Sequence, residues 1–191
     1  NENIESNKSA PDSKKFFTTA LKKINNKDIN VLSISDSSTV GIKDINKEVG
    51  RWHGLIKMKG KGAQQQRNQG GTFGIGKSAP FVCSELRTVL YNTKNVQGES
   101  AFIWKSMFTT HGTPKKTGDG FYCNVSKDDN GETHTNGITD SKIKPSFINR
   151  DHNGADVFIL GFIKPEKEKQ DKKADPWNVI LQRVVLDNYR S

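Results

Sequence analysis

The sequence predicts an α+β fold, a two-layer α/β sandwich in which helices cover a mixed sheet. Two observations predict it. Segments with strand-like apolar runs and segments with helical spacing follow one another without a strict βαβ rhythm. Only 32% of the 191 residues are hydrophobic, so a few concentrated segments must form the core and long polar loops must join them. At this length we expect one domain that covers residues 1–191.

The first half of the chain contains five expected elements. Residues 12–24 form a helix, because their apolar side chains recur at helical spacing behind a capping Asp12 or Ser13. Residues 31–36 form a short β-prone strand, and residues 46–55 a short helix. Residues 77–86 form a helix and residues 88–91 the strand that follows it.

The second half supplies most of the strands. Residues 101–108 and 121–125 are candidate strands, and residues 155–163 give the clearest strand in the chain, since they are apolar and bounded by Gly154 and Pro165. Residues 176–189 form a last helix with Asp175 as N-cap. The polar residues 126–144 form a hairpin or solvated loop, and residues 164–175 a charged surface loop.

A glycine-rich segment is the first candidate site. Gly71, Gly76, Lys77 and Ser78 spell G-x-x-x-x-G-K-S, the motif of the phosphate-binding P-loop. A P-loop follows a buried strand, however, and residues 57–70 are polar and glycine-rich. The glycines instead precede a predicted helix, whose unpaired first-turn N–H groups attract anions. The segment therefore predicts a nucleotide phosphate site outside the P-loop fold.

Asp36 is the second candidate. Strand alternation puts it on the face that carries Leu32 and Ile34, which we expect to face the core. A buried carboxylate needs N–H partners, and an adenine amino group is one such partner. The alternative is that Asp36 caps the next turn, as most acidic residues at strand ends do.

A strand that ends in Asp is followed by a loop with Gly41, a long glycine-rich segment and an F-G-x-G that opens a helix. This combination resembles the GHKL ATPases, the family of gyrase, the large heat-shock chaperone, histidine kinases and MutL. The resemblance implies the GHKL, or Bergerat, fold with ATP and Mg²⁺ as ligands. It implies that Asp36 holds the adenine, that Gly41 belongs to the first motif and that residues 57–71 form a mobile lid. The residues that it places around the nucleotide are Asp36, Gly41, Gly71, Phe73, Gly74, Ile75, Gly76, Lys77, Ser78 and Thr93.

The chain also departs from the family pattern. One extra residue separates Asp36 from Gly41, and the first glycine of that motif is missing. The amino-terminal helix of the form E-x-x-x-N, whose Asn holds Mg²⁺ and whose Glu orients the attacking water, is not recognisable. Either the chain begins downstream of that helix, as a start at Asn1 instead of Met suggests, or the protein binds ATP without hydrolysing it. Its catalytic residues are therefore unknown.

A narrower resemblance covers most of the chain. The glycine segment, the upstream VLSISDSSTVGI and the later DVFILGF resemble bacterial ATP-binding proteins associated with defence against phage. That resemblance implies a nucleotide-driven switch that closes or self-associates on ATP, as part of a longer cytoplasmic protein.

Two other functions remain open. The net charge of +9 favours a polyanion, so the main alternative is a basic nucleic-acid-binding module. In that case Trp52, Trp104 and Phe121 could stack on bases, although we expect them in the core. A P-loop NTPase also needs a strand that ends in an acid, and residues 155–163 are followed by Lys164.

Other functional classes lack their motifs. Cys83 and Cys123 have no metal-ligand spacing, so we expect reduced and mostly buried thiols. The histidines are scattered, and the acidic residues near Asp128 are out of register for a calcium loop, so we expect no metal site formed by these residues. No apolar segment is long enough to span a membrane.

Overall fold

The computed structural model describes residues 11–45, 47, 50–57, 75–108, 118–164, 176 and 179. Its helices are α2 (Pro11–Ile24), α3 (Arg51–Ile56) and α4 (Ala79–Val82), with 3-10 helices η1 (Ile75–Ser78) and η2 (Ser141–Ile143). Its strands are β1 (Val31–Ser35), β2 (Ser84–Lys94), β3 (Ser100–Met107), β4 (Asp119–Tyr122), β5 (Asn124–Lys127), β6 (Thr133–Asn136) and β7 (Gly154–Phe162).

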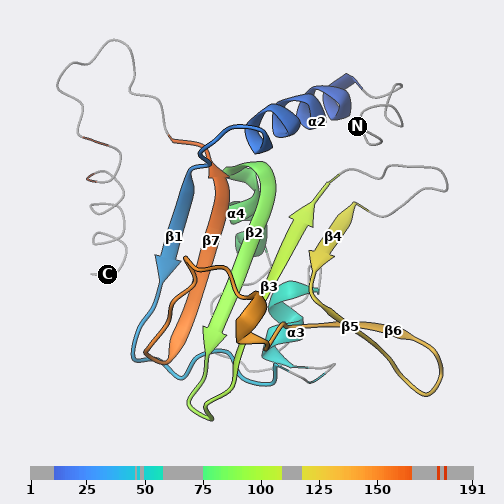
Figure 1. Ribbon diagram of the computed structural model, residues 1–191, viewed down its shortest axis with the longest axis vertical. Helices are drawn as coiled ribbons and strands as arrows, with labels where there is room; N and C mark the ends of the chain where they lie inside the picture. The colour runs from blue at the N-terminus through green and yellow to red at the C-terminus, as the bar shows by residue number, and fades with distance from the viewer. Residues whose placement is uncertain are drawn as a thin grey trace.

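Five of the strands form one sheet in the order β1-β7-β2-β3-β4 (Figure 1). All four neighbouring pairs are antiparallel. The α+β class is therefore confirmed, but the expectation of a mixed sheet is wrong for the described strands. The physical reason is the return of β7, which enters between β1 and β2 and runs opposite to both of them.

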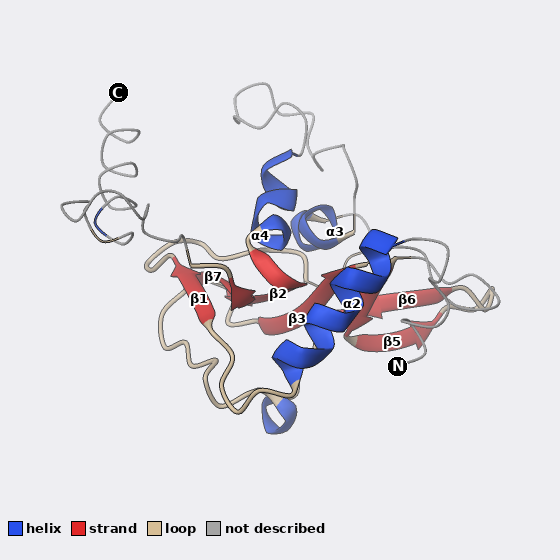
Figure 2. Cartoon of the chain, turned by 90° about the horizontal axis from the view of Figure 1, so that it is seen from above, coloured by secondary structure: helices blue, strands red, loops and turns tan. Residues whose placement is uncertain are grey.

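One face of the sheet is covered by α3 and α4, which lie side by side above the strands in Figure 2. Trp52 and Ile56 of α3 and Phe81 of α4 pack there on Val89 and Ile103 of the sheet, all at most 5% exposed. Of the two apolar cores found among the described residues, this cluster is the larger.

The opposite face carries the second core. Leu90, Phe102 and Phe158 pack there with Ile138 and Ile148 from the segment between β6 and β7.

Helix α2 also contacts this second side, where it crosses the upper end of the sheet (Figure 1). Its Phe17 and Leu21 line an apolar cavity together with Thr88 and Trp104. Trp104 packs against the second core, so α2 approaches the face opposite to α3. The described helices therefore contact both faces of the sheet, whereas we expected them on one face.

The predicted helix 77–86 ends early. Helix α4 stops at Val82, and β2 begins at Ser84, whose hydroxyl accepts the N–H groups of Leu86 at 3.2 Å and Thr88 at 3.0 Å. These bonds take the N–H groups that a continuing helix would use, because a serine hydroxyl competes with helical hydrogen bonding. Cys83 consequently lies at the end of α4 and is exposed, not buried as expected.

Most other elements match the expected ranges. Helix 12–24 and strands 31–36, 101–108 and 155–163 are confirmed within a residue or two. The strand expected over 121–125 is divided at Cys123 between β4 and β5, and α3 begins later than expected, at Arg51. The polar segment 126–144 does contain a hairpin, formed by β5 and β6.

Three predictions lie outside the described residues. They are the lid over 57–71 apart from Lys57, the charged loop over 164–175 apart from Lys164, and the helix over 176–189 apart from Pro176 and Val179. None of the described helices is long and apolar enough to cross a membrane.

Candidate functional site

Asp36 directly follows β1 and is bound to the first residues of β7. Its N–H donates to the carbonyl of Ala155 at 3.0 Å, and its Oδ1 accepts the N–H of Ala155 at 2.6 Å. The hydroxyl of Thr39 donates to the same oxygen at 3.2 Å. No described residue donates a hydrogen bond to Oδ2, and the residue is exposed. One carboxylate oxygen thus anchors the strand end, and the other can accept a hydrogen bond from a ligand.

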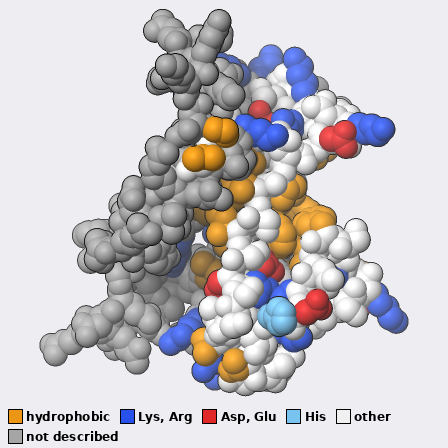
Figure 3. Space-filling view, turned by 90° about the vertical axis from the view of Figure 1, so that its left-hand side faces the viewer, with side chains coloured by type: hydrophobic (Ala, Val, Ile, Leu, Met, Phe, Trp, Pro, Cys, Tyr) orange, Lys and Arg blue, Asp and Glu red, His pale blue; other side chains and the backbone are white. Residues whose placement is uncertain are grey.

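The strand that carries Asp36 is less buried than expected. Ile34 is 54% exposed and Val31 is 45% exposed. Figure 3 views the molecule from this side and shows hydrophobic side chains gathered in the middle of the face, between charged ones above and below. Because β1 has only β7 as a strand neighbour among the described residues, it is an edge strand. The expectation that Asp36 projects from a core-facing side is therefore wrong.

Arg150, which no sequence motif marks, fixes the backbone around Asp36. Its Nε donates to Oδ2 of Asp156 at 2.9 Å, and its Nη2 donates to Oδ1 at 2.6 Å. Nη2 also donates to the carbonyl of Ala155 at 2.8 Å and to that of Asp36 at 2.5 Å. The side chains of Arg150 and Asp156 are 6% and 7% exposed. A planar guanidinium with several donors suits this arrangement, which a lysine could not reproduce.

The two charges of this pair stabilise each other. Burial alone would raise the pKa of Asp156, but hydrogen bonds from Arg150, Asn92 and Ser35 outweigh it, so the pKa is lowered. The hydrogen bond to Asp156 in turn raises the pKa of Arg150. Asn92 of β2 donates to Oδ2 of Asp156 at 2.6 Å. The cluster is therefore an ionised clamp within the protein that joins β7, β2 and the end of β1.

The loop after β1 returns to the sheet at the end of β2. Gly41 has a φ of +66°, and a Cβ atom there would lie 2.9 Å from the carbonyl carbon of Lys94, so the close approach requires glycine. The N–H of Ile42 donates to Oγ1 of Thr93 at 2.9 Å, and the Thr93 hydroxyl donates to the carbonyl of Gly154 at 2.9 Å. Thr93 is 0% exposed. Its hydroxyl thus joins the loop to β7.

Tyr91, two residues before Thr93, belongs to the apolar core that contains Trp52 and Ile56 of α3. Burial raises its pKa to about 12, so it stays neutral at physiological pH.

The predicted phosphate turn is described only from Ile75 onward, and Gly71, Phe73 and Gly74 lie outside the described residues. Ile75, Gly76, Lys77 and Ser78 form η1, which leads into α4. Nζ of Lys77 donates to the carbonyl of Gly54 at 2.7 Å, near the end of α3. The lysine therefore satisfies a carbonyl that a helix end leaves open. Helix α4 has four residues, so its dipole is weaker than that of the longer helix that we expected.

Helix α3 contacts parts of the chain next to both candidate segments. The loop that begins at Asp36 reaches Ile45, which packs in the same core as Trp52 and Ile56 of α3, while Lys77 contacts α3 from η1. Ile45, at the end of the Asp36 loop, and Lys77 of η1 therefore both lie beside α3. Their convergence on a single cleft stays a prediction.

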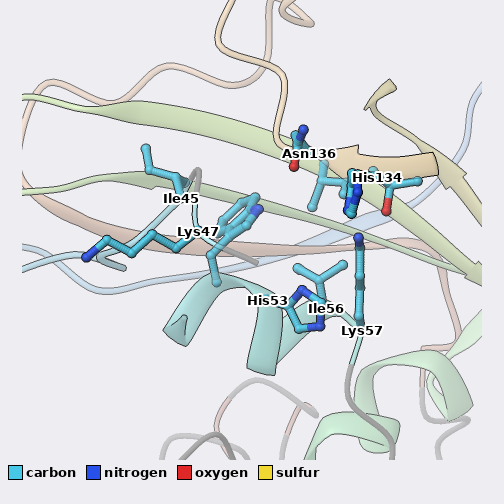
Figure 4. A pocket seen from close by; sticks show the side chains of 10 residues that line it. Ile45, Lys47, His53, Ile56, Lys57, His134 and Asn136 are labelled. Carbon is cyan, nitrogen blue, oxygen red and sulfur yellow. The ribbon is translucent and has the colours of Figure 1, made fainter. Parts of the chain in front are cut away.

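A pocket of about 330 Å³ opens on this face between α3 and β6 (Figure 4). Ile45, Trp52, Ile56 and Ile103 form its apolar lining, and polar groups of α3 and β6 form its rim. Neither Asp36 nor a residue of η1 lines it. Sequence patterns gave no signal for this pocket, because its residues come from three segments that only the tertiary fold brings together.

Asp128, Glu132 and His134 lie together at the β5–β6 turn, with one potential ligand atom of each within 4.8 Å of the others. The turn itself accounts for the cluster. Oδ1 of Asp128 accepts the N–H groups of Asn130 and Glu132 at 3.0 and 2.7 Å, and His134 lies 3.3 Å from Oδ2. The hydrogen bond from the Glu132 backbone is the main cause of the lowered pKa of Asp128.

Comparisons of the chain with protein-family models, with curated proteins and with solved structures each returned no significant match. The GHKL resemblance therefore rests on the sequence motifs of this chain.

Proposed function

We propose that the chain binds ATP and Mg²⁺ in the manner of GHKL ATPases and acts as a nucleotide-driven conformational switch or ATPase. The observation that supports this most is the grouping of Asp36, Gly41 and Thr93. Asp36 accepts the N–H of Ala155, and Thr93 bonds to the neighbouring Gly154 and to the loop that contains Gly41. These three residues are the ones that the resemblance assigns to the purine end of the nucleotide.

The chemistry of the purine end follows from the unused oxygen of Asp36. An adenine amino group can donate to Oδ2 of Asp36, while Oδ1 remains on the Ala155 N–H. Guanine presents a carbonyl oxygen at that position and would face the carboxylate with a second acceptor. The triphosphate would extend toward the backbone of residues 71–78, where N–H groups receive it as in other anion sites. The arrangement therefore predicts selectivity for adenine.

The wider role belongs to the same proposal. Closure or self-association on ATP, a cytoplasmic location and a part in bacterial defence against phage follow from the resemblance. Hydrolysis would need the Glu and Asn of the amino-terminal helix, so binding and turnover are separate questions.

Calorimetric titration with ATP, ADP and GTP, with and without Mg²⁺, tests the proposal. Asp36→Asn keeps the acceptor for the Ala155 N–H but replaces Oδ2 by an N–H₂ donor, so we expect ATP affinity to fall about tenfold or more, the worth of a charged hydrogen bond. Asp151→Asn makes the same exchange on an exposed nearby residue and should leave affinity unchanged. Wild-type ATP affinity in Asp36→Asn, or equal affinity for GTP, would refute the proposal.

The nucleic-acid alternative rests on net charge, and part of that charge is used within the protein. Lys23 pairs with Glu85 at 2.6 Å, and Lys105 donates to the carbonyl of Ile56 at 2.7 Å. Trp52 is 4% exposed and belongs to the core, so it offers no stacking surface. An oligonucleotide affinity that falls steeply with salt and is unchanged in Asp36→Asn would favour this alternative.

A further inference from the structure

The pocket between α3 and β6 has the size and lining of a small-molecule site. Its volume of about 330 Å³ is at the lower end of the usual range for such sites. Ile45, Trp52, Ile56 and Ile103 are at most 4% exposed, so the lining is held rigidly by the core. The apolar side chains of this lining suit an apolar group.

The rim of the pocket is basic. Lys57, which directly follows α3, and His53 of α3 line the pocket together with His134 of β6, and Figure 4 shows the Lys57 amine directed toward His134. Lys57 also acts on Cys123, next to the β5–β6 hairpin, where its charge opposes the increase in the cysteine pKa that burial causes. The ammonium group therefore reaches across the pocket toward the hairpin.

Among the described acidic groups near the rim, Asp128 and Asp44 are engaged elsewhere, and Glu132 lies with Asp128 at the exposed β5–β6 turn. Asp128 pairs with His134 at 3.3 Å on the turn side, and Asp44 pairs with Lys47 at 2.7 Å. The amine of Lys47 points away from the pocket in Figure 4. No ion pair of Lys57 is found among the described residues, so its charge is the one that an anion in the pocket would meet.

We propose that this pocket binds a small aromatic anion, with its ring against the apolar lining and its carboxylate or similar group beside Lys57. The site lies apart from Asp36 and η1, which do not line it, so it is separate from the proposed nucleotide site. An apolar lining with a single basic side favours such a ligand over two others. A neutral apolar compound would leave the Lys57 ammonium unpaired. A bare phosphate would leave the apolar lining without a contact.

The test uses 2-naphthoate and its neutral analogue 2-naphthylmethanol as probes in calorimetric titrations of the whole chain. Lys57→Gln should weaken naphthoate binding about tenfold, because a charge-assisted hydrogen bond is lost. It should leave the binding of the alcohol unchanged. Lys47→Gln is the matched control, since it removes a lysine charge that is paired with Asp44 and directed away from the pocket.

Two further measurements make the result decisive. An unchanged thermal unfolding midpoint of Lys57→Gln shows that the loss comes from the pocket, and naphthoate affinity should be the same with and without saturating ATP. The proposal would be overturned by absence of naphthoate binding to the wild-type chain, by equal binding to Lys57→Gln, or by displacement of naphthoate by ATP.

Discussion

Gly41 and Gly98 have similar backbone angles but different surroundings. Their φ values are +66° and +81°, both in the left-handed region. A Cβ on Gly41 would lie 2.9 Å from the carbonyl carbon of Lys94, whereas a Cβ on Gly98 would meet nothing within 4 Å. Alanine substitutions at these two glycines therefore distinguish the cost of a left-handed backbone from the added cost of a steric clash.

We expect Gly98→Ala to lower the free energy of unfolding by about 1 kcal/mol, the cost of a left-handed alanine. Gly41→Ala should lower it by about 2–3 kcal/mol, because the loop must also move away from β2. Urea denaturation of both variants measures the difference. Equal losses would mean that the loop after Asp36 can leave Thr93 at little cost, and the grouping at the purine end would then lose its structural basis.

Single residues could be predicted where local sequence determines them. Asp36 follows a β-prone run and Gly41 stands in a turn-rich loop, so both were identifiable from the sequence. Arg150 was not, because its partners become neighbours only through the pairing of β1 with β7. The one available signal was Asp156, a carboxylate inside the apolar strand ADVFILGFI, which needs a buried partner.

At the scale of elements, Lys77 joins η1 to α3. Lys77→Met keeps the apolar stem but removes the amine from the Gly54 carbonyl, so we expect the free energy of unfolding to fall by about 1–2 kcal/mol. ATP affinity should change less than about threefold, because the GHKL resemblance assigns phosphate binding to backbone N–H groups. Denaturation and calorimetry on the same samples measure both quantities.

Lys142→Met is the control for Lys77→Met, because Lys142 is an exposed lysine in η2. It should change neither stability nor ATP affinity. A P-loop enzyme would give the opposite result for Lys77→Met, with ATP binding lost and stability retained, since its lysine contacts the nucleotide phosphates.

The limits of helices and strands could be predicted where apolar runs are long. The predictions failed where a side chain redirects the backbone. Strand β7 is a continuous apolar run, and its predicted limits differ by one residue at each end. The end of α4 was missed because Ser84 accepts two backbone N–H groups, and a serine at that position is compatible with a helix by propensity alone.

At the scale of the whole molecule, sequence separation limits what a pattern can reveal. The α+β class followed from the mixture of elements, but the strand order did not, since β7 comes from the far end of the described chain to pair with β1 and β2. The α3–β6 pocket depends on the same long-range arrangement. The strand order and the pocket could therefore be found only in the three-dimensional structure, whereas the residues of the candidate purine end could be chosen from two local motifs.

The clamp formed by Arg150 and Asp156 connects the stability of the whole sheet to pH. Because the pKa of Asp156 is lowered in the folded state, the unfolded chain binds more protons in the acid range, and the free energy of unfolding falls as the pH decreases. This contribution is complete above the unfolded pKa of about 3.9 and is lost as the pH falls through the lower folded pKa.

Asp156→Asn should therefore destabilise the protein by about 3 kcal/mol at neutral pH, since it leaves the buried Arg150 charge without its partner. The difference from wild type should shrink as the pH falls below the unfolded pKa of about 3.9, where the wild-type carboxylate is itself increasingly protonated. Denaturant unfolding across this range measures both curves, with Asp151→Asn as the exposed control. A difference that stays constant with pH would show that Asp156 does not carry the acid dependence, because a titrating clamp must lose its advantage once its carboxylate binds a proton.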